Sequence, residues 1–241
     1  MPPKERAADL AERLLIQRIL DGTYPPGSDL PGERLLCREF GVARPALREA
    51  LQRLSRDGWI DIQHGKSTRV MDLMHSGTLS ILAGLLKVEP RLFGNFVPDV
   101  LEMWGLLAPA YTARAVERTP RAIVELLDGL RGIDDRAEPT VRAMWRMHRA
   151  LIDACGNLVY GLIFNSFEDF YQRLATIYYR DPRQRAGAHD FWIALREAAL
   201  AGDSVTAASL MRQYIERTQA YCRQAAICDL AADENNAELT G

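Results

Sequence analysis

The sequence predicts a mainly α-helical protein in which an N-terminal winged helix-turn-helix precedes a C-terminal all-α helical bundle. Two observations lead to this class. Residues 30–70 read as helices followed by two brief strands that a Gly-Lys turn joins. From about residue 71 onward, apolar residues recur at helical spacing without an alternating strand pattern. We therefore expect a winged domain (1–73), a linker helix (74–88), a helical domain (89–230) and a flexible tail (231–241).

The composition is that of an ordinary globular protein. The 241 residues are 48% hydrophobic and 26% charged, with a mean hydropathy of −0.17, and these values exclude a disordered chain. No apolar run approaches the roughly 20 residues that a membrane span requires. The first residues alternate charges, as a signal peptide does not. We therefore expect a cytoplasmic protein with no membrane partner.

The first two helices are predicted over residues 7–20 and 31–40. An apolar stripe at helical spacing marks the first helix, and an Asp-Gly pair and a Pro-Pro-Gly turn follow it and cannot continue it. In the second helix, we expect Leu35, Leu36 and Phe40 to face the core. A glycine directly after this helix predicts the turn.

The third helix is predicted over residues 44–56, with small and aliphatic side chains on its inward face. Pro45 suits the first helical turn, where its missing N–H removes no hydrogen bond. An Asp-Gly pair ends the helix, and residues 59–62 and 67–70 then form two short strands around a wing tip. Helix, turn, helix and wing in this order place the third helix in the major groove of DNA.

The charge distribution marks the same segment. The whole chain carries a net charge of −2, which argues against a general nucleic-acid binder. Between Arg34 and Arg69, however, eight Lys and Arg residues stand against four Asp and Glu residues, a local net charge of +4. A basic region confined to one module is typical of a specific DNA reader.

Helical patterns fill the rest of the chain. Residues 79–86 predict a helix that links the two domains, and residues 98–116 predict a long apolar helix with a kink at Pro109. Residues 159–179 predict one long aromatic-rich helix that stops before an Asp-Pro pair. The other predicted helices cover residues 120–130, 140–155, 186–201 and 204–227. Such a set indicates an all-α bundle, which can enclose a ligand in its core.

The motifs of residues 24–70 resemble the winged helix-turn-helix of the GntR family of bacterial repressors. The signals are the PPG turn, the LP-x-ER entry, the GV-x-R-x-x-LREAL helix and the GW…GK-x-T-x-V wing. The helical second half is similar to the effector domain of the FadR-like subfamily. The resemblance implies a transcription regulator of fatty-acid metabolism, a repressor or an activator, that binds double-stranded operator DNA as a homodimer.

Arginine suits DNA reading because its planar fork binds guanine O6 and N7 with two hydrogen bonds and also clamps phosphates. The resemblance implies that the operator is contacted by Arg34, Arg44, Pro45, Ala46, Arg48, His64 and Gly65, the last two in the minor groove. For Arg53 and Arg56 we favour a structural interpretation, in which these side chains support the helix surface through pairs such as Glu49–Arg53.

Many relatives in the subfamily hold a metal with an Asp and three histidines. Alignment on this sequence puts Met144, His148, Trp192 and Tyr214 at those four positions, and one imidazole cannot hold Zn²⁺, which needs three or four ligands. The four cysteines have no metal-finger spacing either. We therefore expect no metal and no cofactor in the helical domain.

Bulky apolar side chains in place of the metal ligands suit a lipid-like effector, and the resemblance implies a long-chain fatty acyl-CoA. The side chains expected to bind it are Trp104, Tyr171, Arg173, Tyr178, Trp192, Tyr214, Arg217 and Thr218.

Several alternatives stay open at this point. The effector could be a different small organic acid or lipid-like ligand, or the aromatic residues could be ordinary bundle core, as aromatic stripes at helical spacing usually are. A DNA-bound structural protein without a ligand is another alternative. An enzyme is not expected, because no carboxylate pair, nucleophile–His set or Gly-rich phosphate loop stands out.

Overall fold

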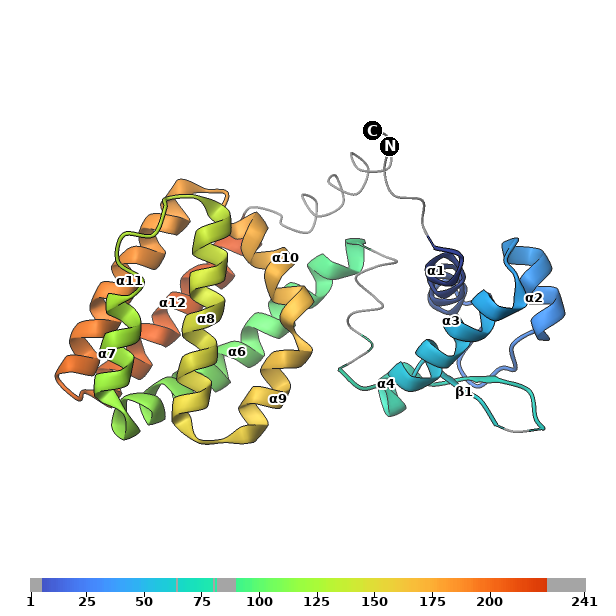
Figure 1. Ribbon diagram of the computed structural model, residues 1–241, viewed down its shortest axis with the longest axis horizontal. Coiled ribbons are helices and arrows are strands. Elements are labelled where there is room, and N and C mark those ends of the chain that lie inside the picture. The colour runs from blue at the N-terminus through green and yellow to red at the C-terminus, as the bar shows by residue number, and fades with distance from the viewer. Residues whose placement is uncertain (1–5, 64, 80, 82–89, 225–241) are drawn as a thin grey trace. The chain divides into compact units, whose positions relative to one another are not determined.

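The computed structural model describes residues 6–63, 65–79, 81 and 90–224, and the chain divides into two compact units, Met1–Pro90 and Arg91–Gly241 (Figure 1). Most of the predicted linker helix at residues 79–86, and the whole predicted tail at residues 231–241, lie outside the described residues. None of the helices within the described ranges is both long and apolar enough to cross a membrane.

The N-terminal unit has the predicted helix-turn-helix. Its helices are α1 (Ala7–Leu20), α2 (Glu33–Phe40), α3 (Arg44–Asp57) and the short α4 (Leu73–Ser76). The inward face of α3 carries Leu47, Ala50, Leu51 and Leu54, none more than 5% exposed, at the spacing of one helix face. Full burial of each such leucine contributes about 2 kcal/mol to stability. This packing against α1 fixes α3 with its opposite side toward solvent.

The prediction that Leu35 belongs to the core face of α2 is wrong. Leu35 is 53% exposed, whereas its neighbour Leu36 is 1% exposed and Phe40 is 7% exposed. Consecutive residues of a helix point about 100° apart, so an eight-residue helix lying on a small core buries only positions four apart. Gly41 then ends α2 in the left-handed conformation (φ 66°), which glycine adopts without strain.

The wing is a two-stranded antiparallel ribbon. Strand β1 (Ile60–Asp61) pairs with β2 (Arg69–Val70), and Ile60 lies opposite Val70. Both strands are shorter than the predicted ranges of residues 59–62 and 67–70. Trp59, which is fully buried, holds the ribbon to the body of the unit. An isolated antiparallel β-bridge between the backbones of Asp29 and Arg69 is a second connection.

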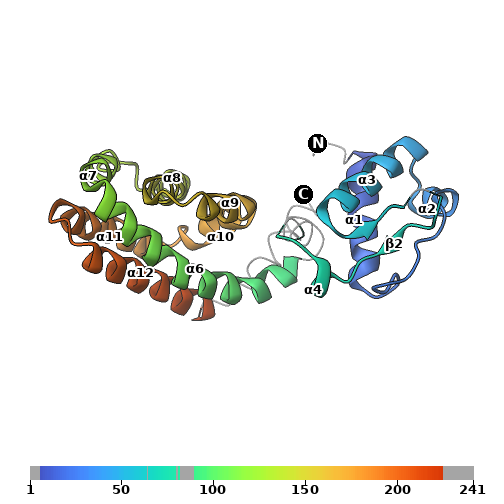
Figure 2. The same ribbon diagram turned by 90° about the horizontal axis from the view of Figure 1, so that it is seen from below.

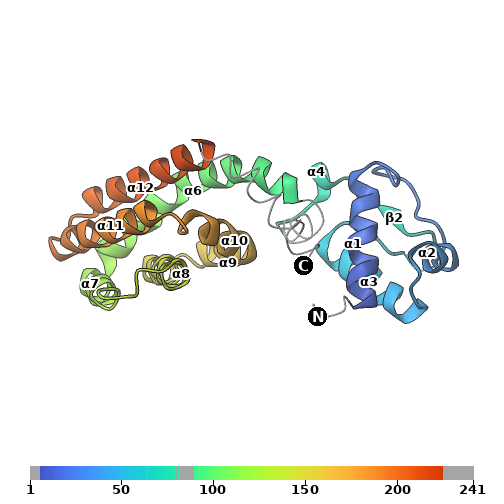
Figure 3. The same ribbon diagram turned by 90° about the horizontal axis from the view of Figure 1, so that it is seen from above.

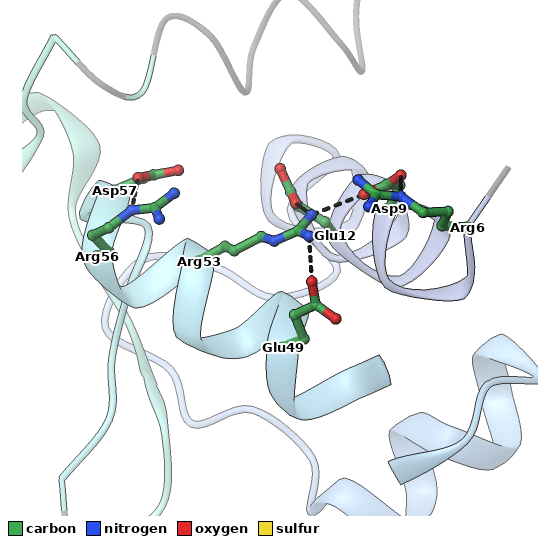
Figure 4. A network of polar contacts seen from close by, with 7 residues as sticks. All are labelled: Arg6, Asp9, Glu12, Glu49, Arg53, Arg56 and Asp57. Carbon is green, nitrogen blue, oxygen red and sulfur yellow. Dashed lines mark hydrogen bonds and ion pairs between the residues drawn. The ribbon is translucent and has the colours of Figure 1, made fainter. Parts of the chain in front are cut away.

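One arginine joins α3 to α1. The Arg53 guanidinium donates hydrogen bonds to Asp9 (2.8 Å) and to Glu12 (3.1 Å) on α1, and it also pairs with Glu49 one turn back on α3 (Figure 4). The Glu12 side chain is only 7% exposed, and Arg53 is the cation that compensates its charge in this contact.

The C-terminal unit is helical in all its described elements. These are α6 (Pro90–Arg118), α7 (Pro120–Asp128), α8 (Ala137–Cys155), α9 (Leu158–Ser166), α10 (Glu168–Tyr178), α11 (Pro182–Leu200) and α12 (Ser204–Gln224). Figures 2 and 3 show α6 and α12 along one side of this unit and α7, α8 and α9 along the opposite side. This all-α bundle confirms the predicted fold class.

Several helix boundaries differ from the sequence prediction; α8 begins at Ala137 and not at residue 140, and α11 begins at Pro182 and not at residue 186. Helix α6 begins at Pro90 and not at Pro98, so Pro98 and Pro109 both lie inside it. Proline is well tolerated at a first helical position, and Pro90 fills that position as well as Pro98 would have done. The kink at Pro109 stays a prediction.

The predicted single helix over residues 159–179 is two helices, α9 and α10, separated at Phe167. This residue leaves the helical conformation (φ −106°, ψ 9°) and buries its side chain against Trp104, with ring centroids 5.9 Å apart. Glu168 and Asp169 then occupy the first turn of α10, where the helix dipole favours carboxylates. Tertiary packing of one aromatic ring therefore overrides an unbroken helical pattern.

Candidate functional site

The solvent side of the helix-turn-helix presents arginines from two helix starts. Ala43 is extended (φ −74°, ψ 152°), so Arg44 opens α3, with Pro45 in the first turn. Arg44 and Pro45 are exposed and Ala46 is half-buried. Arg34, on the first turn of α2, is also exposed, and neither Arg34 nor Arg44 has an ion-pair partner among the described residues. Two unpaired cations at adjacent helix starts suit contact with phosphates and base edges.

Arg48, one turn after Arg44, is held by a neighbour. Its Nε donates to both carboxylate oxygens of Glu33 on α2, each at 3.0 Å. Arg48 keeps 64% of its side chain exposed, and the Glu33 carboxylate raises the pKa of the Arg48 guanidinium, which stays charged. The pair therefore lies at the surface of the unit and joins α2 to α3.

The wing tip is described in part. Gly65 is exposed and adopts the left-handed conformation (φ 74°), and no atom would lie within 4 Å of a Cβ added there. His64, the other predicted minor-groove residue, lies outside the described residues. At the other end of α3, Arg56 pairs with Asp57, and Arg53 pairs with the carboxylates of α1. Both ion pairs support the structural interpretation of Arg53 and Arg56.

The C-terminal unit contains a cavity between α6, α8, α9, α10 and α12. Its free volume is about 80 Å³, room for several water molecules. The wall is mostly apolar and aromatic, with Trp104, Tyr111, Met144, Phe164 and Phe170 among its side chains. The cavity is far smaller than the roughly 300–1,000 Å³ of sites that hold drug-sized ligands. A large ligand would therefore have to part these helices.

Five of the eight predicted effector residues line this cavity. They are Trp104, Tyr171, Tyr178, Tyr214 and Thr218.

The other three lie elsewhere. Trp192 is buried behind the wall, where its Nε1 donates to the sulfur of Met144 (2.9 Å). Arg217 is exposed, and its guanidinium carbon lies 5.6 Å from the centroid of the Tyr214 ring. Arg173 is half-buried on α10 and is not part of the cavity wall. The sequence pattern thus predicted which residues share one face of a helix. It did not predict which of those side chains reach the cavity.

Polar groups stand at two places on the apolar wall. The hydroxyl of Tyr111 shares a hydrogen bond with Nδ1 of His148 (2.7 Å). Elsewhere the hydroxyls of Tyr179 and Tyr214 are hydrogen-bonded to each other, and Thr218 Oγ1 donates to Tyr178 Oη (3.3 Å). These hydroxyls are the groups that could bind the polar part of a ligand.

Burial keeps this cavity neutral. Desolvation lowers the pKa of His148 from 6.5 to about 4, so its imidazole is uncharged at neutral pH. Desolvation also raises the pKa of Tyr171, Tyr179 and Tyr214 well above the ordinary value of 10.0, so each phenol keeps its proton. The cavity offers a ligand hydrogen bonds and apolar contact but no charge on these groups.

Several wall residues were not predicted from the sequence, and three of them, Tyr111, Tyr179 and Phe164, show why. Tyr111 follows Trp104 by seven positions on α6, which places both on one helix face, and this spacing was available as a signal. Tyr179 directly follows the predicted Tyr178 and lies just past the end of α10. Phe164 is on α9, whose separation from α10 the sequence did not predict.

The four positions considered for a metal in the sequence, Met144, His148, Trp192 and Tyr214, make other contacts in the structure, and the His148 imidazole is hydrogen-bonded to Tyr111. The sulfur of Met144 accepts from Trp192, and the Tyr214 ring stacks on Phe191 (4.5 Å between centroids). Within the part of the chain that the structure describes, no three His, Cys, Asp or Glu side chains gather as a metal-binding group. These residues do not fit a metal ion.

A winged helix-turn-helix with exposed arginines, followed by a helical unit around an apolar cavity, defines a DNA-binding transcription regulator. Comparison with protein families agrees. Residues 7–70 match the bacterial regulatory proteins of the gntR family, and residues 71–227 match the FadR C-terminal domain. The chain belongs to the GntR family and carries a FadR-type C-terminal domain. It is a regulatory protein and not an enzyme.

Relatives of known name cover nearly the whole chain. A fatty acid metabolism regulator protein of Shewanella denitrificans is 35% identical over 207 residues, which are 86% of this chain and 87% of that protein. One of Pasteurella multocida is 35% identical over 86% of each chain. Among solved structures, Lar, which controls expression of the Listeria monocytogenes agr system, superposes with a TM-score of 0.58 at 17% identity over 92% of this chain and 98% of that one. The last likeness shows the fold alone.

Proposed function

We propose that this protein regulates genes of fatty-acid metabolism, binds a pseudo-palindromic operator as a homodimer, and leaves DNA when a long-chain fatty acyl-CoA enters the metal-free cavity. Relatives at 35% identity are named as regulators of fatty acid metabolism. The observation that carries the proposal is the cavity of the C-terminal unit, whose wall is aromatic and apolar with uncharged tyrosine hydroxyls.

An acyl chain suits this wall better than a small carboxylate does. None of the residues that line the cavity carries a full charge at neutral pH, so a small anion would lose its hydration without gaining a counter-ion. Each buried methylene of an acyl chain contributes about 0.8 kcal/mol. A long chain therefore supplies free energy that offsets the cost of widening a cavity of only about 80 Å³.

The DNA contacts belong to the other unit. Arg34, Arg44 and Arg48 supply positive charge and base-reading forks at the starts of α2 and α3, with Pro45 and Ala46 beside them. His64 and Gly65 at the wing tip would reach the minor groove. A single unit of this size reads few base pairs, so two copies on two half-sites give the specificity of an operator.

The test is a titration of the full chain on its own operator. An operator is selected from a randomised duplex library, labelled with a fluorophore and bound by the protein, and anisotropy then follows release. Palmitoyl-CoA and oleoyl-CoA should release the DNA at micromolar concentration or below, and CoA without an acyl chain should not. Failure of both acyl-CoAs to bind or release would overturn the acyl-CoA assignment. A different lipid-like ligand or small organic acid, found by mass spectrometry of purified protein, would then replace it.

A further inference from the structure

The ion pair between Glu33 and Arg48 places a carboxylate among the arginines of the DNA-binding face. Glu33 is the first residue of α2, directly after Gly32, and Arg48 lies one turn into α3. Both helices are anchored by buried side chains next to the pair, namely Leu36 on α2 and Leu47 on α3, at 1% and 0% exposure. The two backbones are therefore held at fixed positions, although the ion pair itself lies at the surface.

The geometry of this pair leaves the reading end of the arginine free. Nε of Arg48 donates to both Oε atoms of Glu33 at 3.0 Å, and neither terminal nitrogen bonds to another of the described residues. Nη1 and Nη2 are the donors that can bind guanine O6 and N7 end-on. An arginine that is free in solution loses rotamer entropy when it is immobilised, and a guanidinium already held at Nε loses less.

The negative charge of Glu33 also favours specificity, because it weakens the non-specific attraction of Arg48 to DNA. Attraction to phosphates supplies most of the sequence-independent affinity for DNA, and each neutralised phosphate adds to the salt dependence of binding. A carboxylate at 3.0 Å from Arg48 offsets part of that attraction. Specific contact with a base edge survives this offset because it depends on hydrogen-bond geometry.

We propose that Glu33 is a positioning residue that holds the Arg48 guanidinium for base reading and so raises the specificity of the protein rather than its affinity for DNA. The inference rests on the proposed contact between Arg48 and the operator. It adds to that contact a second residue, which need not touch DNA itself.

Another role for Glu33 is purely local. An acidic side chain in the first turn of a helix is stabilised by the helix dipole. Glu39 provides the matched control, because it also lies on α2 and carries the same charge. Glu39 pairs with Arg18 (3.4 Å) and accepts from Tyr24 (3.2 Å), away from Arg48. Glu33→Gln and Glu39→Gln thus remove one negative charge each from one helix.

The experiment measures base discrimination of the full chain. The selected operator and a set of duplexes with single base-pair changes are titrated with wild type, Glu33→Gln, Glu39→Gln and Arg48→Ala. Arg48→Ala should remove discrimination at the base pair that Arg48 reads in each half-site. Glu33→Gln should reduce discrimination at that same base pair by about tenfold, within the range for one bidentate contact. It should leave other positions unchanged and bind random DNA more tightly.

A double-mutant cycle separates the possible outcomes. In the Arg48→Ala background, Glu33→Gln should have no further effect on base discrimination, because residues that act through one contact are not additive. Unchanged discrimination in Glu33→Gln, at a base pair that Arg48→Ala does affect, would overturn the inference alone. An equal loss of base discrimination in Glu39→Gln would also overturn the inference, because the effect would then follow from the change in net charge alone. If Arg48→Ala changes base discrimination at no position, the proposed contact between Arg48 and the operator is itself wrong, and the inference fails with it.

Discussion

The Arg53 guanidinium lies 2.8 Å from the Asp9 carboxylate, so a side chain of α3, the helix that we propose reads DNA, is bonded to the first helix of the chain. The same guanidinium is 3.1 Å from Glu12, whose side chain is 7% exposed. Removal of the arginine would leave a nearly buried carboxylate without this cation, and such a loss costs more free energy than an exposed ion pair ever supplies. The contact thus secures the packing of α3 on α1.

Replacement of Arg53 by methionine should destabilise the protein. The methionine keeps most of the apolar stem but removes the cation that bonds both Asp9 and Glu12, and we expect the free energy of unfolding to fall by about 2 kcal/mol. Urea denaturation of the full chain, monitored by circular dichroism, measures this change. The matched control is Arg56→Met, three residues along α3, since Arg56 is 73% exposed and its one ion pair among the described residues is with the adjacent Asp57. A similar loss in both variants would contradict the prediction.

Replacement of Arg44 by alanine should strongly weaken operator recognition without unfolding the chain. Arg44 is exposed at the start of α3 and supports no packing, whereas loss of one base-reading arginine costs about 1–3 kcal/mol, or roughly 10- to 100-fold in affinity. Gel shift with the selected operator measures the loss, and circular dichroism checks the fold. Arg56→Ala removes the same charge from the other end of α3 and should reduce affinity far less. Undiminished operator affinity in Arg44→Ala would refute the assignment.

Two substitutions on α6 should change effector binding in opposite directions. Ala108 is fully buried in the cavity wall, so Ala108→Leu should fill the cavity and weaken palmitoyl-CoA binding by about tenfold or more, at about 0.8 kcal/mol per displaced methylene. Trp104→Ala should enlarge the cavity and shift preference toward longer acyl chains. Isothermal titration with a series of acyl-CoAs measures both effects. Ala110→Leu, exposed on the same helix, is the control. Unchanged acyl-CoA binding in both cavity variants would show that the effector does not bind in this cavity.

Local signals carried most of the helix-turn-helix prediction. The ends of α2 and α3 were predicted at Gly41 and Gly58, and both glycines adopt the left-handed conformation (φ 66° and 91°) that ends a helix. Such ends depend on a few neighbouring residues and can be read from them. Leu35 shows the limit, because an apolar residue on a short helix gives no sign of which positions the core will reach.

The cavity could be predicted only in part, for a different reason. Trp104 and Trp192 are both large aromatic residues at helical spacing in the sequence, yet one lines the cavity and the other packs behind it. The difference depends on how α8 and α11 are set against α6, which no local pattern records. Phe167 likewise divides α9 from α10 through its contact with Trp104. Contacts between segments distant in the sequence therefore determine which aromatic residues line the cavity and where α9 and α10 separate.

The buried imidazole of His148 should make stability depend on pH between neutrality and pH 4. Burial lowers its pKa from 6.5 to about 4, so in this range the unfolded chain binds a proton that the folded chain does not. The stability is fully present above pH 6.5 and is lost as pH falls, by on the order of 3 kcal/mol at 1.36 kcal/mol per pKa unit. The substitution His148→Gln removes the titrating group and keeps an acceptor for Tyr111. Its unfolding free energy should therefore fall less than that of wild type from pH 7 to pH 4.5, measured by urea denaturation. Parallel curves for the two proteins, or an NMR titration in which His148 protonates near pH 6.5, would show that the imidazole is not kept neutral by burial.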